Sequence, residues 1–489
     1  MTADQPGSTR GADSAEKADV VVLGMGPGGE YAAGCLAEAG LSVVGVEARL
    51  LGGECPYWGC VPSKMMIRAA DLLAEGRRIP GMAGAATVSP DWRPVARRIR
   101  DEATDNWDDK VAVDRFTGKG GRFVRGRGRL TAPGEITVDT AGGRRVIRAR
   151  RAILINTGTA PAIPPVDGLA GTPYWTNREA IETEKVPGSL IVLGGGSIGA
   201  ELSQMFARFG ARLTVVEAAE RLIPMDEPEA SALLAEIFGR EGITVKVGTA
   251  AAGVRYDGHG FALTLAGGET LTADRLLVAT GRKTGLAELG VAAVGIDPRA
   301  RVIDVDDRMR VVLPGGDPAG HGAGPDGGAG LWAIGDVTGK GAFTHVSMYQ
   351  ADIAMRDILG LGGPSADYHA LPRVTFTDPE IGVVGLTEAQ AAAQGIAVRT
   401  GFTDVPSTTR GFIHKAGNDG FIKLIEDRGR GVLVGATSVG PWGGEVLGAL
   451  AVAVHGRMDT ERLAQMIFAY PTFHRGIEAA LQDLRSNQR

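Results

Sequence analysis

The sequence contains few cysteines, little net charge and no long apolar segment. Only three of its 489 residues are cysteines, Cys35, Cys55 and Cys60, which excludes a disulfide-stabilised scaffold and suits a reducing, cytoplasmic setting. A net charge of -5 indicates neither a nucleic-acid nor an anionic-membrane partner. No run reaches the roughly eighteen apolar residues of a transmembrane helix, and no metal site is predicted.

Glycine, in contrast, is abundant. The chain has 74 glycines, about twice the average share, which is typical of folds with many tight turns and close backbone approaches. The length predicts more than one domain. The first seventeen residues are small and polar, so we expect a disordered tail rather than a signal peptide.

A first glycine-rich turn follows a buried-strand pattern at residues 18–23. Its glycines, Gly24, Gly26 and Gly29, open a helical segment, and a second strand then ends at Glu47. Gly24 is expected to make the turn, Gly26 to let a pyrophosphate approach the backbone, and Gly29 to let the helix pack on the strand. Glu47 is expected to accept hydrogen bonds from a ribose. The context predicts a dinucleotide site.

The same pattern occurs a second time in the chain. A strand at residues 189–193 leads into Gly194, Gly196 and Gly199, a helix follows, and the next strand is closed by Glu217. Two such units in one chain predict two bound dinucleotides facing each other.

Two cysteines, Cys55 and Cys60, stand five positions apart in a run rich in glycine and proline. A helix starting near Cys55 brings them close enough to bond if its first turn is distorted. The pattern is compatible with a redox-active pair at a helix N-terminus, where negative charge is favoured, and equally with two buried structural thiols.

Together, the two glycine-rich turns, the run from Cys55 to Lys64, the Thr280-Gly281-Arg282 segment and the Ala333-Ile334-Gly335-Asp336 segment resemble the class I pyridine nucleotide-disulfide oxidoreductases. This family includes dihydrolipoyl dehydrogenase, glutathione reductase and mercuric reductase. The resemblance implies an α/β fold with two Rossmann-like dinucleotide-binding domains plus an α+β C-terminal dimerisation domain, and therefore a homodimer. The extra C-terminal cysteine pair of mercuric reductase is absent.

The resemblance also implies a domain order. It gives a tail at 1–17, an FAD-binding domain at 18–160, an NAD(P)-binding domain at 161–283, a second part of the FAD/central domain at 284–365 with a glycine-rich surface loop at 314–330, and a dimerisation domain at 366–489.

The resemblance assigns cofactors and roles. FAD is expected to contact Gly24, Gly26, Gly29, Glu47, Gly53, Lys64, Gly128, Thr157, Gly158, Asp336 and His345. NAD(H) is expected to contact Gly194, Gly196, Gly199, Glu217 and Gly281. Cys60 would be the thiolate facing the flavin, Cys55 would exchange with substrate, and Lys64 would pair with Glu201 beside the flavin.

An acid at Glu217 suits the free 2′-hydroxyl of NAD and repels a 2′-phosphate. Arg221, four residues later, is a candidate phosphate ligand, so NADP(H) is the less favoured alternative.

The C-terminus departs from the family pattern. The family carries His-Pro-Thr-x-x-Glu, in which the histidine serves the exchanging thiol. Here Tyr470 replaces that histidine and Arg475 replaces the glutamate. A tyrosine is a poor base at neutral pH, so the group serving Cys55 is expected to be either Tyr470 as a proton donor or His474. A purely structural His474 is the alternative.

These patterns favour an enzyme that passes electrons between NAD(H) and a thiol/disulfide substrate through FAD and a Cys55–Cys60 disulfide. The alternative is an NADH-dependent reductase of quinones, metal ions or other acceptors, and a third possibility is a flavoprotein subunit without turnover. Pro56-Tyr57-Trp58 between the thiols is bulkier than the family's usual Asn-Val, which predicts aromatic surface near the disulfide and an aromatic or otherwise unusual acceptor.

Overall fold

The computed structural model of the chain describes residues 15–315 and 329–486. Most of the predicted tail and most of the predicted glycine-rich loop lie outside these ranges. The chain divides into two compact units. The first unit is formed by the described residues of Met1–Tyr57, Trp107–Ala160 and Lys283–Ala366, and the second by Trp58–Asn106, Pro161–Arg282 and Asp367–Arg489.

The first unit is built on one mixed sheet. Its elements are β1 (Glu16–Leu23), α1 (Pro27–Glu38), β2 (Val43–Glu47), α5 (Lys110–Gly118), β3 (Arg122–Arg125), β4 (Arg127–Ala132), β5 (Glu135–Thr140), β6 (Gly143–Ile155), α9 (Leu286–Leu289), β16 (Gly330–Ala333) and α10 (Thr344–Leu359). The strand order is β3-β2-β1-β6-β5-β4, with β16 also paired to β6. β1, β2, β3 and β16 run parallel to their neighbours, whereas β4 and β5 form an antiparallel meander with β6.

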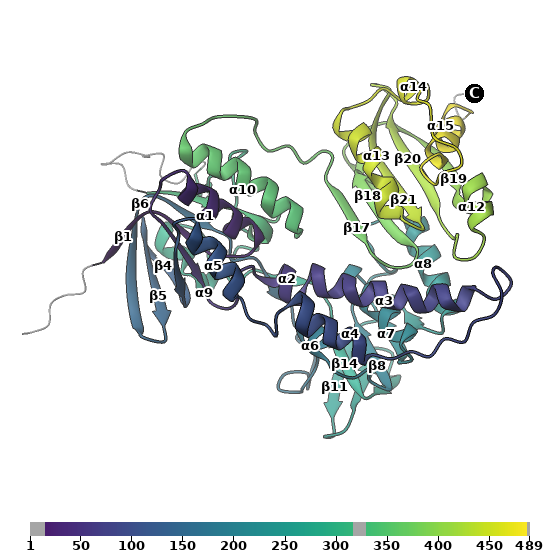
Figure 1. Cartoon of the computed structure of the whole chain (residues 1–489), viewed down its shortest axis with the longest axis horizontal. Helices are drawn as coiled ribbons and strands as arrows, with labels where there is room; N and C mark the ends of the chain where they lie inside the picture. Colours follow the sequence, from purple (N-terminus) through teal and green to yellow (C-terminus); the bar gives the residue numbers. More distant parts are fainter. Residues whose placement is uncertain (1–14, 316–328, 487–489) are drawn as a thin grey trace, which may run out of the picture. The chain divides into compact units, whose positions relative to one another are not determined.

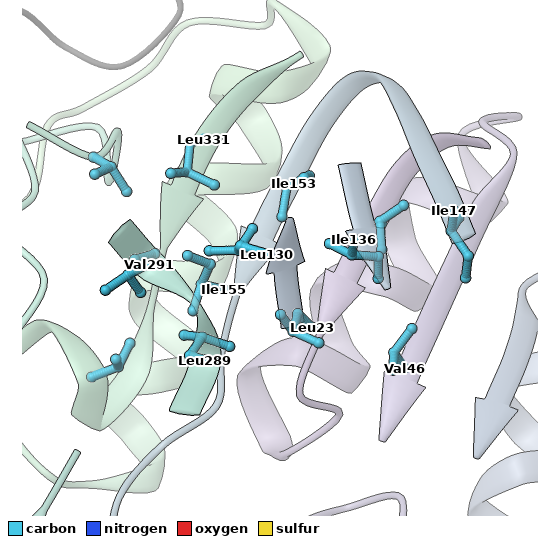
Figure 2. Close-up of a cluster of buried hydrophobic side chains, with 14 of the residues drawn as sticks. Leu23, Val46, Leu130, Ile136, Ile147, Ile153, Ile155, Leu289, Val291 and Leu331 are labelled. Carbon is cyan, nitrogen blue, oxygen red and sulfur yellow. The ribbon is translucent and has the colours of Figure 1, made fainter. Parts of the chain in front are cut away.

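Side chains that alternate along β1 build a core on each face of this sheet. Val20 and Val22 pack with helices α1, α5 and α10, and α1 and α10 lie side by side (Figure 1). Leu23 packs on the opposite face, where Figure 2 shows it among Val46, Ile136 and other side chains of the meander and of the segment after α9. Both faces are therefore apolar, as expected for a parallel strand covered on both sides.

The second unit begins at Trp58, and its first long helix starts at Cys60. It contains α3 (Cys60–Arg78), α4 (Arg93–Arg98), a π-helical turn (Ile99–Ala103), α6 (Asn177–Glu182), β8 (Ser189–Leu193), α7 (Ser197–Arg208), β9 (Arg212–Val216), α8 (Pro228–Arg240), β10 (Thr244–Lys246), β11 (Ala251–Tyr256), β12 (Phe261–Leu265), β13 (Thr270–Ala273) and β14 (Arg275–Val278). The strands β10-β9-β8-β14 form a parallel sheet, and β11-β12-β13 form an antiparallel one.

The C-terminal part of this unit has an antiparallel sheet in the order β17-β18-β21-β20-β19. Its elements are β17 (Pro372–Thr375), β18 (Glu380–Gly385), α11 (Glu388–Ala393), β19 (Val398–Asp404), α12 (Thr409–His414), β20 (Phe421–Asp427), β21 (Val432–Gly440), α13 (Gly443–His455), α14 (Thr460–Leu463) and α15 (Gly476–Ser486). Helices α13 and α15 pack against this sheet, and Figure 1 shows both of them beside its strands.

The remaining short elements connect these layers. They are α2 (Glu54–Trp58), β7 (Ala160–Pro161), β15 (Arg282–Lys283) and the 3-10 turns Val291–Val294, Gly335–Thr338 and Val405–Ser407. The predicted fold class, with two Rossmann-like domains and a C-terminal dimerisation domain, is confirmed. The predicted domain boundaries stay a prediction. Within the described ranges, every helix is too short or too polar to cross a membrane.

Candidate active site

The first glycine-rich turn needs glycine for steric reasons. Gly24 has a φ of 96°, and a Cβ there would collide with the carbonyl oxygen of Asn156. A Cβ at Gly29 would collide with the carbonyl of Gly24, so strand and helix pack without room for a side chain. At Gly26 a Cβ would meet the Asn156 amide nitrogen at 3.4 Å. A second loop approaches the same turn, because a Cβ at Gly53 would lie 2.7 Å from the Gly26 Cα.

Glu47 is held in a fixed position at the end of β2. The backbone N–H of Met25 donates to Glu47 Oε2 at 2.9 Å, and that of Arg49 donates to Oε1 at 2.8 Å. A carboxylate oxygen has two lone pairs, so each oxygen keeps capacity for a ribose hydroxyl. The residues present therefore fit a dinucleotide: a helix N-terminus for phosphates and a preoriented acid for the ribose.

The second turn repeats the first one closely. Gly194 has a φ of 104°, and a Cβ there would collide with the carbonyl of Ala279. A Cβ at Gly199 would collide with the carbonyl of Gly194. At Gly196, by contrast, a Cβ would point into space free of the described protein atoms for 4 Å. The Cβ direction is thus open at Gly196, whereas the matching direction at Gly26 faces Asn156.

Glu217 is oriented in the same way as Glu47. The backbone N–H of Gly195 donates to Glu217 Oε2 at 2.6 Å, and that of Ala219 donates to Oε1 at 2.7 Å. In both turns the donors are the residue after the first glycine and the residue two after the acid. The second turn therefore also fits a dinucleotide.

Apart from Lys64, which belongs to the second unit, the remaining residues expected at FAD lie in the first unit, and their roles stay predictions. Asp336 accepts a hydrogen bond from Thr159 Oγ1 at 2.7 Å, just after the exposed Thr157 and the positive-φ Gly158. His345 is exposed in the first turn of α10.

Gly128 has a packing reason to be glycine. It lies in β4, where a Cβ would collide with the Leu23 side chain and approach that of Val46 at 3.2 Å. The apolar core of the first unit therefore excludes a side chain here, whatever Gly128 contributes to a cofactor site. Gly281, expected at NAD(H), has a φ of 112°, a conformation that favours glycine.

The two cysteines of the candidate redox pair lie close together along the chain, on consecutive helices. Cys55 is the second residue of α2 and is half-buried, whereas Cys60 is the exposed first residue of α3. The N-terminus of a helix favours negative charge, so the position of Cys60 suits a thiolate. Cys60 and Lys64, one turn apart, share one side of α3.

Lys64 is fixed by contacts from two other parts of the second unit. Its Nζ lies 2.7 Å from Glu201 Oε2 of α7, and it stands 4.6 Å above the ring centroid of Phe376. The backbone N–H of Phe376 donates to the other Glu201 oxygen at 2.9 Å. Glu201 is buried, so this carboxylate has a fixed ammonium partner and a fixed amide partner. The pairing predicted from the sequence is present; its role beside a flavin stays a prediction.

The Lys64–Glu201 pair is one end of a polar seam between α3 and α7. Further along α3, Asp71 accepts from Arg208 at 2.7 Å, and Arg78 reaches Asp378 at 2.6 Å. Asp378 also accepts from Arg208 at 2.7 Å. Sequence reasoning missed this seam, although the seven-residue spacing of its α3 members was a signal.

Tyr57, between the two cysteines, is buried. Its hydroxyl donates to the carbonyl of Leu51 at 3.1 Å, and burial together with the nearby Asp109 carboxylate raises the pKa of Tyr57 to about 12. The expectation of an exposed aromatic surface is therefore wrong for Tyr57, because the ring fills the interior of the first unit. At neutral pH its hydroxyl remains protonated.

The C-terminal residues expected to serve Cys55 have different surroundings. Tyr470 is 65% exposed, and the Arg475 guanidinium lies 5.4 Å from its ring centroid. His474 is half-buried, with its Nε2 at 3.4 Å from Thr472 Oγ1. Arg475 forms an ion pair with Glu478 at 2.8 Å. The roles of Tyr470 and His474 stay predictions.

Comparison with known proteins identifies the class. Residues 18–351 match the family described as pyridine nucleotide-disulphide oxidoreductase, and residues 371–481 match the dimerisation domain of the same family. The chain therefore belongs to the pyridine nucleotide-disulphide oxidoreductases. It is a flavoprotein disulfide oxidoreductase with a dimerisation domain. The family typically binds FAD and NAD(P).

Individual relatives carry two different names. The chain is 33% identical to a mercuric reductase of Streptomyces lividans over 476 residues, 96% of each chain. It is 31% identical to a dihydrolipoyl dehydrogenase of Chlorobaculum tepidum over 482 residues, 96% of this chain and 97% of the relative. The crystal structure of LpdA from Mycobacterium tuberculosis is similar with a TM-score of 0.81 at 27% identity, over 96% of this chain and 99% of that one.

Proposed function

We propose that the protein transfers electron pairs between NAD(H) and a thiol/disulfide substrate through FAD and a Cys55–Cys60 disulfide. The observation that carries this proposal is the arrangement at the start of α3. Cys60 occupies the helix N-terminus, and Lys64, one turn later, is fixed by the buried carboxylate of Glu201. A purely structural thiol pair needs neither a cation such as Lys64 beside it nor a carboxylate such as Glu201 that orients this cation.

The thiol chemistry balances without a further reagent. Bound FAD would supply the transfer of two electrons between NADH and the thiol pair. The Cys55–Cys60 disulfide takes up two electrons and one proton, all supplied by NADH, and becomes a Cys55 thiol and a Cys60 thiolate. The Cys55 sulfur then attacks a substrate disulfide as its proton passes to the leaving sulfur, so that a mixed disulfide forms and one thiol is released. The Cys60 thiolate attacks the Cys55 sulfur and restores the pair, and the second leaving thiolate takes a proton from solvent.

The second turn favours NAD(H) over NADP(H). Two backbone amides fix the Glu217 carboxylate, and a carboxylate beside the adenosine ribose would repel a 2′-phosphate. The Arg221 guanidinium donates to the carbonyls of Asp226 and Pro224 and to Ser231 Oγ, each at 2.8 Å. This arginine is thus bound by its own loop and by Ser231 of α8, which argues against a role as phosphate ligand.

The protein is proposed to act as a homodimer through its dimerisation domain. That domain exposes large apolar side chains, including Phe412 at 78% and Ile467 at 95%. Such exposure is typical of a surface that a partner covers.

A second candidate function is NADH-dependent reduction of a metal ion or another non-disulfide acceptor. The exposed Tyr470, in place of the family histidine, favours it, as does the similarity to mercuric reductases.

Anaerobic stopped-flow reduction with NADH tests the proposal, followed by turnover with lipoamide, low-molecular-weight disulfides, quinones and metal ions. Wild type is expected to develop the long-wavelength absorbance of a thiolate beside oxidised flavin, and Cys55→Ser and Cys60→Ser are expected to lose disulfide turnover. Normal quinone or metal-ion turnover in both serine variants, with no such absorbance in wild type, would favour the second candidate.

A further inference from the structure

Trp58 stands between the two cysteines and is held on three sides by helix α6 (Asn177–Glu182). The Asn177 side-chain amide donates to the carbonyl of Trp58 at 2.7 Å. The indole N–H of Trp58 donates to Glu182 Oε1 at 2.6 Å, and the Arg178 guanidinium lies 4.7 Å from the indole centroid. The backbone, the ring edge and the ring face of one residue are thus each contacted by a different residue of one short helix.

Helix α6 is itself firmly attached to the rest of the second unit. The residue two before it, Trp175, continues the parallel sheet: its N–H donates to the carbonyl of Leu276 and its carbonyl accepts from Val278, both at 2.7 Å. At the other end, the indole N–H of the buried Trp92 donates to the carbonyl of Thr183 at 2.9 Å. A capping box also closes the first turn of α6. A six-residue helix would not be stable alone, so these attachments make it a rigid support.

Because Trp58 lies between Cys55 and Cys60, its attachment to α6 restrains the segment that connects the two cysteines. Trp58 lies three residues after Cys55 and two before Cys60, and the intervening Gly59 is the N-cap of α3. A disulfide requires a narrow range of distances and dihedral angles, whereas two thiols do not. Fixing the middle of the four residues that connect the cysteines removes conformations in which the sulfur atoms are far apart, and therefore raises their effective concentration.

We propose that α6 is a positioning element for the thiol pair, and that Trp58, Asn177 and Glu182 set its reduction potential by holding the connection between the cysteines. The inference rests on the proposed redox function of Cys55 and Cys60. Loosening the connection lowers the effective concentration of the two thiols, so the disulfide becomes easier to reduce. The expected change is a shift of the equilibrium toward the dithiol.

Equilibration of the FAD-containing protein with glutathione redox buffers, followed by alkylation and mass counting of free thiols, tests the inference without relying on turnover. Trp58→Ala is expected to shift the equilibrium about tenfold toward the dithiol, equivalent to about 30 mV for a two-electron couple. Asn177→Ala is expected to give a smaller shift in the same direction. Trp58→Phe keeps the ring against Arg178 and loses the indole N–H, so it reports on the contact with Glu182 even if Trp58→Ala does not fold.

A matched pair of glutamate variants separates the contact from a change of charge. Glu182→Gln weakens the contact with Trp58, whereas Glu184→Gln removes the same charge from an exposed residue two positions further on. The inference requires a shift in the first variant and none in the second. Equal potentials in wild type, Trp58→Phe and Asn177→Ala, or shifts toward the disulfide, would overturn it. If wild type forms no disulfide in oxidised buffer, the proposed function itself is wrong.

Discussion

The two glycine-rich turns are nearly the same structure with different surroundings. Each has a positive-φ glycine packed against a neighbouring carbonyl and an acid held by two backbone amides. The first turn is approached by the loop that carries Gly53, whereas Gly196 of the second faces open space among the described residues. We therefore expect the first dinucleotide to be retained and the second to exchange.

The helices after the two turns differ as well. Along α7, Glu201, Gln204 and Arg208 are buried and polar, and they bind α3 and the segment before β18. Helix α1 buries mainly glycine, alanine and leucine, and its Glu30 forms a surface ion pair with Arg115. The same motif therefore serves two purposes: one helix packs into a core, and the other carries the partner of Lys64.

The largest effect is expected where the positive-φ glycines are replaced. Gly24→Ala forces an unfavourable backbone conformation, worth about 1–3 kcal/mol, and adds a collision with Asn156, so most of the bound FAD should be lost. Gly194→Ala has the same geometry but should leave FAD in place and slow reduction by NADH about 100-fold through misplacement. Flavin absorbance and stopped-flow reduction measure both. Loss of FAD in Gly194→Ala would contradict the division of roles.

Replacement of the buried acid on α7 is expected to have the next largest effect. Glu201→Gln leaves Lys64 without its carboxylate and should cost about 2 kcal/mol of unfolding free energy, less than the roughly 3–5 kcal/mol of a fully buried pair, because Lys64 is partly exposed. The matched change on α1, Glu30→Gln, breaks a surface pair and should cost about 0–1 kcal/mol. Urea unfolding of both variants measures the difference, and equal costs would remove the distinction between the two helices.

Glu47 at the end of β2 and Glu217 directly after β9 should affect the binding of different nucleotides. Glu217→Gln keeps the side-chain shape but removes the charge that repels a 2′-phosphate, so the preference for NADH over NADPH should fall about tenfold, a change of about 1.4 kcal/mol. Glu47→Gln should weaken FAD retention and leave that preference unchanged. The ratio of kcat/KM values for the two nucleotides checks this. An unchanged ratio in Glu217→Gln would mean that another group sets the preference.

The smallest effect on stability is expected at the open side of the second turn. Gly196→Ala adds a methyl group to open space, so unfolding free energy should change by about 0.5 kcal/mol or less. The KM for NADH should nevertheless rise about tenfold if a pyrophosphate approaches this backbone. A large loss of stability without a change in KM would show that the space is not a ligand site.

Local sequence patterns were sufficient to predict both turns, because their geometry depends on residues close together in the chain. The glycine at each tight turn and the acid at the end of the next strand are such features. The same patterns missed Asn156, which closes the first turn from 132 positions away, and Phe376, which contacts both Lys64 and Glu201. Contacts of that range depend on how strands and helices pack, and local sequence patterns do not reveal them.

The region between the cysteines was interpreted incorrectly in part for a related reason. Pro56-Tyr57-Trp58 suggested exposed aromatic surface because composition alone does not distinguish an anchor from a contact surface. The structure buries Tyr57 and attaches Trp58 to α6. Trp58 is thus held by residues distant in sequence, whereas Tyr57 bonds to Leu51, six positions before it.

The central claim is that Cys55 and Cys60 take up the electron pair delivered by NADH. Anaerobic titration with NADH, followed by rapid alkylation and mass counting of modified cysteines, tests it most directly. One equivalent of NADH is expected to expose two alkylatable thiols, at Cys55 and Cys60, with Cys35 unchanged and the flavin still oxidised. A fully reduced flavin at one equivalent, with no gain in alkylation at either cysteine, would contradict the claim.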